Sequence, residues 1–226
     1  VLFYYLNKPE LDVFLDDPTW DGHAWVAQKV WGIDKDHKDF QLFRQISKAI
    51  NFGIIYGEGD KLLAAQLGKT VQEAKSFRND YYRRIPGISE FIRTVPKKML
   101  ERGYVYNRFG RKYSVEKERT YVLVNYLIQG TSADFLKNRM CVIDNLDMYR
   151  SGIANLILQV HDELVIECKI DYVEQCLEET KKVLEEPILR KSLPAKAYIH
   201  YPSYVHKVDY SKEAWEKTKN AILSSR

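Results

Sequence analysis

The chain has 226 residues, enough for one large domain or two small ones with a sizeable buried core. Hydrophobic residues make up 45% and charged residues 29%, which argues against disorder, and no apolar run approaches the ~18 residues of a membrane-spanning helix. The net charge of +4 is compatible with nucleic-acid binding but does not establish it, because a binding surface depends on how charges cluster.

Helical patterns dominate the chain from Leu11 to about Arg102. Gly32 and Gly68 follow two of the apolar periodic segments, as residues that end helices do. Thr70 and Glu73 have the spacing of a capping box. We therefore expect helices over residues 20–31, about 39–55, 61–67, 70–82 and 89–102.

The later part of the chain mixes helices with short strands. Alternation and turn residues predict one hairpin over 104–106 and 112–115, then an interrupted helical stretch over 117–149. After Gly152 the expected elements are strands 153–160 and 164–166, a helix 172–184, a β pair 198–201 with 204–208, and a helix 212–222. A mostly helical first part, 1–103, thus precedes an α+β second part, 104–226.

Four side chains recur at i, i+4 on the second predicted helix: Arg44, Lys48, Phe52 and Tyr56. At 100° per residue each step drifts by only ~40°, so the four share one face. Two cations followed by two rings suit a nucleotide, with charge for the phosphates and flat surfaces for base or sugar. An amphipathic helix with core-facing aromatics and solvated cations has the same spacing.

Three polar residues, His161, Asp162 and Glu163, interrupt the two strand-like apolar runs. Asp alone is a common turn residue, so a simple turn is one interpretation. Two adjacent carboxylates beside apolar strands repel one another unless a cation is present, and oxygen ligands suit Mg²⁺. The alternative interpretation is therefore a metal or catalytic site.

Two longer motifs resemble those of family A DNA polymerases, the polymerase I family. The segment from Arg44 to Gly57 is similar to the fingers-helix motif B, RxxxKxxxFxxxYG, and QVHDEL at 159–164 is similar to the palm motif C. Three shorter segments are also similar to family segments, in the family's order: His23 in DGH, 104–111 in GYVYNRFGR, and 125–131 in NYLIQGT. The resemblance covers essentially the whole chain.

The resemblance implies a binding site for an incoming dNTP. If these residues act as in the family's motifs, Arg44, Lys48 and His23 would hold the β- and γ-phosphates of the dNTP. Phe52 would stack on the sugar and base, and Tyr56 would stack at the templating position.

The resemblance also implies DNA contacts and a metal site. Asn125, Gln129, Arg108 and Arg111 would contact primer-template DNA. Asp162 would be one of two aspartates that bind two Mg²⁺ ions for nucleotidyl transfer to the primer 3′-hydroxyl, as both a catalytic and a metal residue. Glu163 would be an accessory acid, and His161 would lie near the primer terminus.

The implied fold is α+β, a helical fingers subdomain plus a palm with a small antiparallel sheet. The sequence departs from the family in lacking motif A, DYSxIExR, which carries the other metal-binding aspartate. We therefore expect the chain alone to be inactive or nearly so, and to need an N-terminal polymerase segment that carries motif A and the thumb. The family also usually has an Arg close before Asn125, whereas here Arg119 lies a little further off and Tyr121 intervenes.

Two other functions remain open at this point. A single-subunit RNA polymerase shares parts of these motifs, although Phe52 and the HDEL form of motif C favour DNA synthesis. A non-catalytic DNA-binding remnant would need none of the metal carboxylates. The scattered cysteines (Cys141, Cys168 and Cys176) predict neither a disulfide framework nor a zinc site, so we expect an intracellular, reducing compartment.

Overall fold

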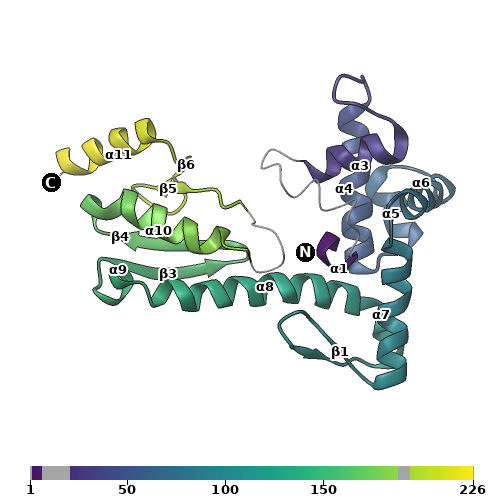
Figure 1. The fold of residues 1–226 in the computed structure, drawn as a ribbon. Coiled ribbons are helices and arrows are strands. Elements are labelled where there is room, and N and C mark those ends of the chain that lie inside the picture. The colour runs from purple at the N-terminus through teal and green to yellow at the C-terminus, as the bar shows by residue number, and fades with distance from the viewer. Residues whose placement is uncertain (1, 7–20, 188–193, 226) are drawn as a thin grey trace. The chain divides into compact units, whose positions relative to one another are not determined.

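The computed structural model describes residues 2–6, 21–187 and 194–225, without the side chains of residues 3, 4 and 54–56 (Figure 1). The chain forms two compact units, Val1–Phe135 and Leu136–Arg226. None of the described helices is long and apolar enough to cross a membrane.

The first unit is mainly helical. Its helices are α1 (Leu2–Leu6), α3 (Gly22–Trp31), α4 (Phe40–Tyr56), α5 (Asp60–Leu67), α6 (Val71–Arg84) and α7 (Ile88–Arg102). A hairpin of β1 (Val105–Tyr106) and β2 (Lys112–Tyr113) follows, then the 3₁₀ helix η2 (Lys117–Val122) and the start of α8 (Leu123–Asp144).

Local capping interactions determine where several of these helices begin and end. The Asp21 carboxylate accepts hydrogen bonds from the His23 and Ala24 amides at the start of α3. Thr70 and Glu73 form a complete capping box at the start of α6. Gly32 and Gly68 adopt left-handed backbone angles after α3 and α5. These predicted boundaries are therefore confirmed to within about two residues.

The first unit has two apolar clusters. Buried side chains of α3, α4, α5 and α6 form one of them, including Val26, Ile46, Ile50, Leu63 and Tyr81. The other cluster joins α7 and the β1–β2 hairpin to the first turns of α8. Tyr113 of β2 packs against Gly130 of α8 so closely that an added methyl group would lie 1.9 Å from the Tyr113 hydroxyl.

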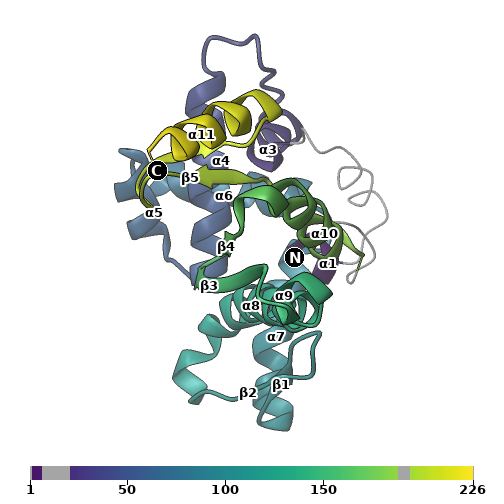
Figure 2. The ribbon, with the colours of Figure 1, turned by 90° about the vertical axis from the view of Figure 1, so that its left-hand side faces the viewer.

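The second unit packs helices on a β-hairpin. It contains the end of α8, α9 (Asp147–Arg150), β3 (Ala154–Val160), β4 (Glu163–Cys168), η3 (Ile170–Tyr172), α10 (Val173–Glu185), β5 (Tyr198–His200), β6 (Lys207–Asp209) and α11 (Lys212–Ser224). Helices α9 and α10 lie beside the antiparallel β3–β4 pair (Figures 1 and 2), and their apolar side chains form one buried cluster with side chains of the two strands. A β-bulge at Ile157 shifts the register of β3 against β4.

The predicted α+β organisation with small antiparallel sheets is confirmed. The predicted placement of Glu163 in the break between the strands is wrong, because Glu163 pairs with Val160 as the first residue of β4 and leaves a two-residue turn.

The short helix α1 has no counterpart among the predicted elements, and the helical pattern expected from Leu11 to residue 20 lies outside the described residues. The units divide inside α8, and the predicted division at residue 103 follows polymerase subdomains and stays a prediction.

Candidate nucleotide-binding and nucleic-acid-binding sites

The face of α4 predicted to bind a nucleotide lies opposite the helix's buried face. Ile46 and Ile50 are 1% exposed, whereas Lys48 is exposed and Phe52 is 41% exposed. The alternative with core-facing aromatics is therefore wrong for Phe52. The Tyr56 side chain lies outside the described residues.

Asp21 connects the start of α3 to Arg44 on α4. Its Oδ1 accepts hydrogen bonds from the His23 and Ala24 amides at the start of α3, while Oδ2 accepts a hydrogen bond of 2.7 Å from Arg44 Nε. Burial alone would raise the pKa of Asp21, but the hydrogen bonds from Arg44, Ala24 and His23 outweigh it and hold that pKa below its usual value. Arg44 is thus positioned by an acid that competes with any phosphate for the guanidinium.

His23 is held by a chain of hydrogen bonds that runs into the core. The hydroxyl of Tyr81, which is 0% exposed, donates to Asn51 Oδ1, and Asn51 Nδ2 lies 3.1 Å from His23 Nδ1. Because an amide nitrogen can only donate, Nδ1 accepts and the neutral imidazole carries its proton on Nε2. Burial lowers the pKa of His23, nearby Asp21 opposes this, and Arg44 and Lys48 add to it.

These side chains form one group, which we call the α3–α4 cluster: Asp21, His23, Arg44, Lys48 and Phe52. The ring centroids of His23 and Phe52 are 6.5 Å apart, and Lys48 Nζ lies 5.8 Å from the Phe52 centroid. Two cations, a neutral N–H donor and an exposed ring therefore occupy one surface. Such a set can neutralise a polyphosphate and pack against a sugar or base.

The two arginines predicted to contact DNA differ in their surroundings. Arg111 makes hydrogen bonds of 2.6–3.0 Å to both oxygens of Asp134, a carboxylate that is 9% exposed. The Asn107 side chain also donates a hydrogen bond to Asp134, and its Oδ1 accepts hydrogen bonds from the Phe109 and Arg111 amides within the hairpin loop. Arg111 thus anchors the hairpin to α8, whereas the Arg108 side chain is exposed at the loop.

The two amides predicted to contact DNA lie one turn apart on α8. Gln129 is exposed, and Asn125 is partly buried. Asn125 Oδ1 is buried and has no hydrogen-bond partner among the described residues. An orphaned buried acceptor is costly, so this oxygen requires a donor from a water molecule or from a bound group.

The predicted catalytic turn lies in the second unit, at the tip of the β3–β4 hairpin. His161 has a left-handed φ of 53°, the only such value of a non-glycine residue among the described residues. Two-residue hairpin turns of the favoured types need a positive φ at this first central position. This backbone angle costs energy in a non-glycine residue, and it places Asp162 at the exposed tip.

Glu163, directly after the turn, is already engaged by the β5–β6 hairpin. Lys207 forms an ion pair with it, the Tyr204 hydroxyl lies 3.4 Å away, and His200 Nε2 lies 3.7 Å away. The hydrogen bond from Lys207 is the largest cause that holds the pKa of Glu163 below its usual value. Glu163 therefore stays ionised and fixed to β6.

The chemistry of Asp162 fits a divalent cation. Its carboxylate is exposed and forms no hydrogen bond or ion pair with the described residues, and Mg²⁺ prefers such oxygen ligands. The described part of the chain contains no group of three His, Cys, Asp or Glu side chains arranged to hold a metal. Asp162 thus fits as a single carboxylate ligand.

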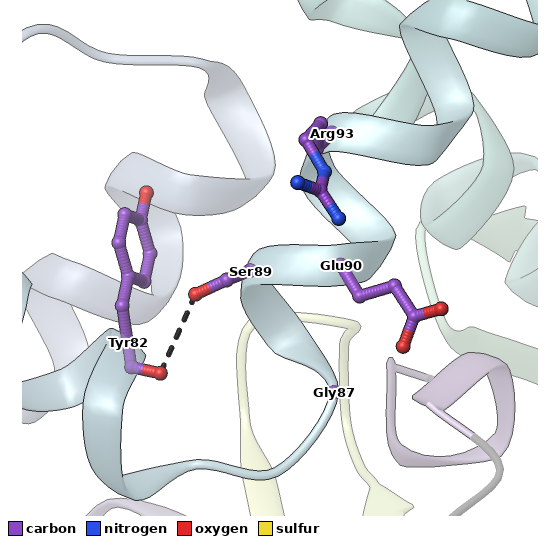
Figure 3. A pocket seen from close by; sticks show the side chains of 5 residues that line it. All are labelled: Tyr82, Gly87, Ser89, Glu90 and Arg93. Atoms are coloured by element: carbon purple, nitrogen blue, oxygen red, sulfur yellow. Dashed lines mark hydrogen bonds between the residues drawn. The ribbon is translucent and has the colours of Figure 1, made fainter.

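A hollow of about 400 Å³ lies at the turn between α6 and α7 (Figure 3). Its lining residues are Tyr82, Gly87, Ser89, Glu90 and Arg93, none of which belongs to the predicted site. The Ser89 hydroxyl points to the Tyr82 carbonyl oxygen at 3.4 Å. This hydrogen bond links the two ends of the turn, and we assign no function to the hollow.

Sequence reasoning missed Asn51, Tyr81 and the role of Asp21 toward Arg44. Asn51 carries a detectable signal, a polar residue within the apolar run AINFG of an amphipathic helix. An aspartate such as Asp21 is a common helix N-cap, a residue type that gives no sign of a partner on another helix. Tyr81 carries no local signal because its partner is 30 residues away.

Comparison with known proteins adds a family assignment. The model of the family described as DNA polymerase family A matches residues 8–202. DNA polymerase I of Pseudomonas aeruginosa is 36% identical over 179 residues, which cover 74% of this chain and 19% of that protein. DNA polymerase I of Aquifex aeolicus is 36% identical over 183 residues, covering 76% of this chain and 31% of that protein.

A solved structure shares the fold. The POL domain of Pol1 from M. smegmatis, in complex with DNA primer-template and dNTP, matches with a TM-score of 0.71 at 25% sequence identity. The match covers 80% of this chain and 34% of that chain. This chain therefore spans about a fifth to a third of the length of these three relatives.

Proposed function

The chain belongs to DNA polymerase family A, and on that premise we propose that it serves template-directed DNA synthesis from dNTPs. The observation that carries the proposal is the α3–α4 cluster, in which cations and an exposed ring follow one another along α4. The proposed substrates are primer-template DNA and dNTPs, which are also bound in the M. smegmatis structure.

The proposed roles on α3 and α4 follow from charge and shape. Arg44 and Lys48 neutralise the triphosphate, and His23 donates a hydrogen bond from Nε2 to a phosphate oxygen. Phe52 packs against the sugar or base. Tyr56 keeps its predicted role at the templating position. Binding a phosphate at Arg44 requires that the guanidinium turn away from Asp21 or share its donors.

The proposed metal chemistry involves Asp162. Two Mg²⁺ ions would supply the positive charge that nucleotidyl transfer to a primer hydroxyl requires. Asp162 would hold them as one carboxylate ligand, and we propose that the further ligand comes from a polymerase segment outside this chain, together with the thumb. His161 would lie near the primer terminus, and Glu163 would act as an accessory acid held by Lys207.

The proposal also includes residues that contact DNA. Arg108, Asn125 and Gln129 would contact the primer-template, with Arg111 mainly supporting the hairpin that carries Arg108.

Since the described cysteines are free thiols, we also propose a reducing compartment.

The test is primer extension with Mg²⁺ and dNTPs by the chain alone and by the chain mixed with an N-terminal polymerase segment that carries motif A. Asp162→Asn removes one charge at the turn, and Glu167→Gln removes one from an exposed residue of the same hairpin as a control. We expect extension only in the mixture, abolished by Asp162→Asn and retained by Glu167→Gln. Extension by the chain alone at a full polymerase rate would contradict the need for a second segment. DNA binding without extension in either sample would leave a binding remnant.

A further inference from the structure

Tyr121 closes over the end of α4, from a distant part of the sequence. Gly57 directly follows α4 with a left-handed φ of 68°. A methyl group added at Gly57 would lie 2.7 Å from Cδ2 and 3.3 Å from the carbonyl oxygen of Tyr121. The ring edge and backbone of Tyr121 therefore pack directly on Gly57, and only glycine leaves room for them.

This contact uses only part of the Tyr121 side chain. Tyr121 is 52% exposed, more than Phe52 at 41%, and its hydroxyl forms no hydrogen bond with the described residues. A large aromatic side chain that packs by one edge and leaves the rest to solvent offers a surface for stacking. Exposed aromatic side chains of this kind are how proteins bind unpaired bases.

The direction of α4 indicates what meets that surface. Arg44 and Lys48 provide charge in the first half of the helix, and Phe52 provides a ring further along. Gly57 is five residues beyond Phe52, which is ~7.5 Å at 1.5 Å per residue. A nucleotide with its phosphates at the cations therefore has its base toward the end of α4 where Tyr121 lies.

The residues that follow Tyr121 in the chain also have side chains that suit contacts with bases. Asn125 is four residues later and Gln129 four more, and Asn125 Oδ1 is buried without a partner among the described residues. An exposed ring is thus followed along the chain by two amides, the groups that hydrogen-bond base edges.

This inference rests on the proposed function. We propose that Tyr121 is a template-strand contact, and that its ring stacks on an unpaired template base next to the newly forming pair. Paired bases are already stacked on their neighbours, so the open face of Tyr121 suits the single-stranded part of the template. Because stacking releases no counterions, this contact strengthens binding without adding to its salt dependence.

The experiment measures binding of a fluorescent primer-template with a short unpaired template overhang, by anisotropy, to the full chain. The variants are Tyr121→Ala, Tyr121→Phe and, as a control, Tyr172→Ala, which removes a ring that is 41% exposed in η3. Each overhang nucleotide is replaced in turn by an abasic one. Thermal unfolding of each variant tests whether it is folded.

We expect Tyr121→Ala to bind about 5- to 100-fold more weakly with an unchanged slope of affinity against salt, whereas Tyr121→Phe and Tyr172→Ala bind like the wild type. One abasic position should weaken DNA binding by the wild type but not by Tyr121→Ala, because both changes remove the same stacking contact between ring and base. Wild-type affinity of Tyr121→Ala, additive losses at every position, or a lowered salt slope would overturn the inference while DNA binding itself stands. A wild-type chain that binds no primer-template would instead contradict the proposed function, and this inference with it.

Discussion

The Asp21 carboxylate makes two sets of contacts: Oδ1 caps α3, and Oδ2 accepts a 2.7 Å hydrogen bond from Arg44. The side chains of Arg44 and Asp21 are 37% and 32% exposed, so the pair itself contributes only about 0–1 kcal/mol to stability. Its larger consequence concerns ligands, because the acid occupies a donor that a phosphate needs.

Replacing Asp21 with asparagine separates these two roles. Asparagine is a good N-cap, so we expect Asp21→Asn to change stability by less than about 1 kcal/mol. With the competing charge gone, affinity for inorganic triphosphate should rise several-fold, as isothermal titration calorimetry can measure. Asp21→Ala, the control, loses the cap as well and should cost about 1 kcal/mol of stability. Equal triphosphate affinity in Asp21→Asn and the wild type would show that the ion pair does not compete with phosphate.

His23 makes stability depend on pH. Burial lowers its pKa in the folded protein, so below pH ~6.5 the unfolded chain binds a proton that the folded chain does not. Stability should therefore fall as the pH drops from ~6.5 toward the lowered pKa, by up to ~1.4 kcal/mol per pH unit from this one group. Urea unfolding at several pH values measures this loss. His23→Gln can still accept from Asn51 but does not titrate, so an identical pH profile in that variant would assign the loss to other groups.

Two helical glycines should respond oppositely to alanine. At Gly130 the added methyl group would lie 1.9 Å from the Tyr113 hydroxyl, whereas at Gly53 its closest contact is 3.5 Å, to Glu58. We expect Gly130→Ala to destabilise by about 1–3 kcal/mol, and Gly53→Ala to be neutral or stabilising by up to ~1 kcal/mol, because alanine favours the helix. Thermal and urea unfolding compare the two, and similar values would mean that Tyr113 moves aside without cost.

The contact of Gly57 with Tyr121 can be separated from backbone strain. Gly57 and Gly68 both have left-handed angles, but only Gly57 has a neighbour within 4 Å of an added methyl group. Gly68→Ala should cost about 1–2 kcal/mol from the backbone alone, and Gly57→Ala should cost more. In a Tyr121→Ala background the extra cost of Gly57→Ala should shrink in urea unfolding, because the 2.7 Å contact with the ring is removed while the 3.3 Å contact with the carbonyl oxygen of residue 121 remains. An unchanged difference between the two glycine variants would have a cause other than the Tyr121 ring.

The two hairpin arginines should separate stability from DNA binding. Arg111→Ala removes one partner of the buried Asp134 carboxylate and should measurably lower the stability of the folded chain. Arg108→Ala should change stability by less than about 0.5 kcal/mol but lower the salt slope of DNA binding by about 0.9, the value for one phosphate contact. Urea unfolding and salt-dependent anisotropy measure the two effects. A stable Arg111→Ala variant with a reduced salt slope would instead make Arg111 a DNA contact.

The amino-acid sequence by itself determined most helices and hairpins, because their signals act over a few residues. Asp21, Thr70, Gly32 and Gly68 mark helix ends through contacts with their own neighbours in the chain. The i, i+4 spacing likewise predicted that Arg44, Lys48 and Phe52 share a face. Glu163 was misplaced because strand register depends on the partner strand, which local composition does not specify.

Only the tertiary structure decided which partners the site residues have. Arg44 meets an acid 23 residues away, His23 an amide 28 residues away, and Glu163 a lysine 44 residues away. These pairs depend on the path of the chain between elements, since a side chain carries no record of the distant group that will face it. For the same reason the sequence identified Tyr121 only as a departure from its family, whereas the structure brought it onto Gly57 at the end of α4.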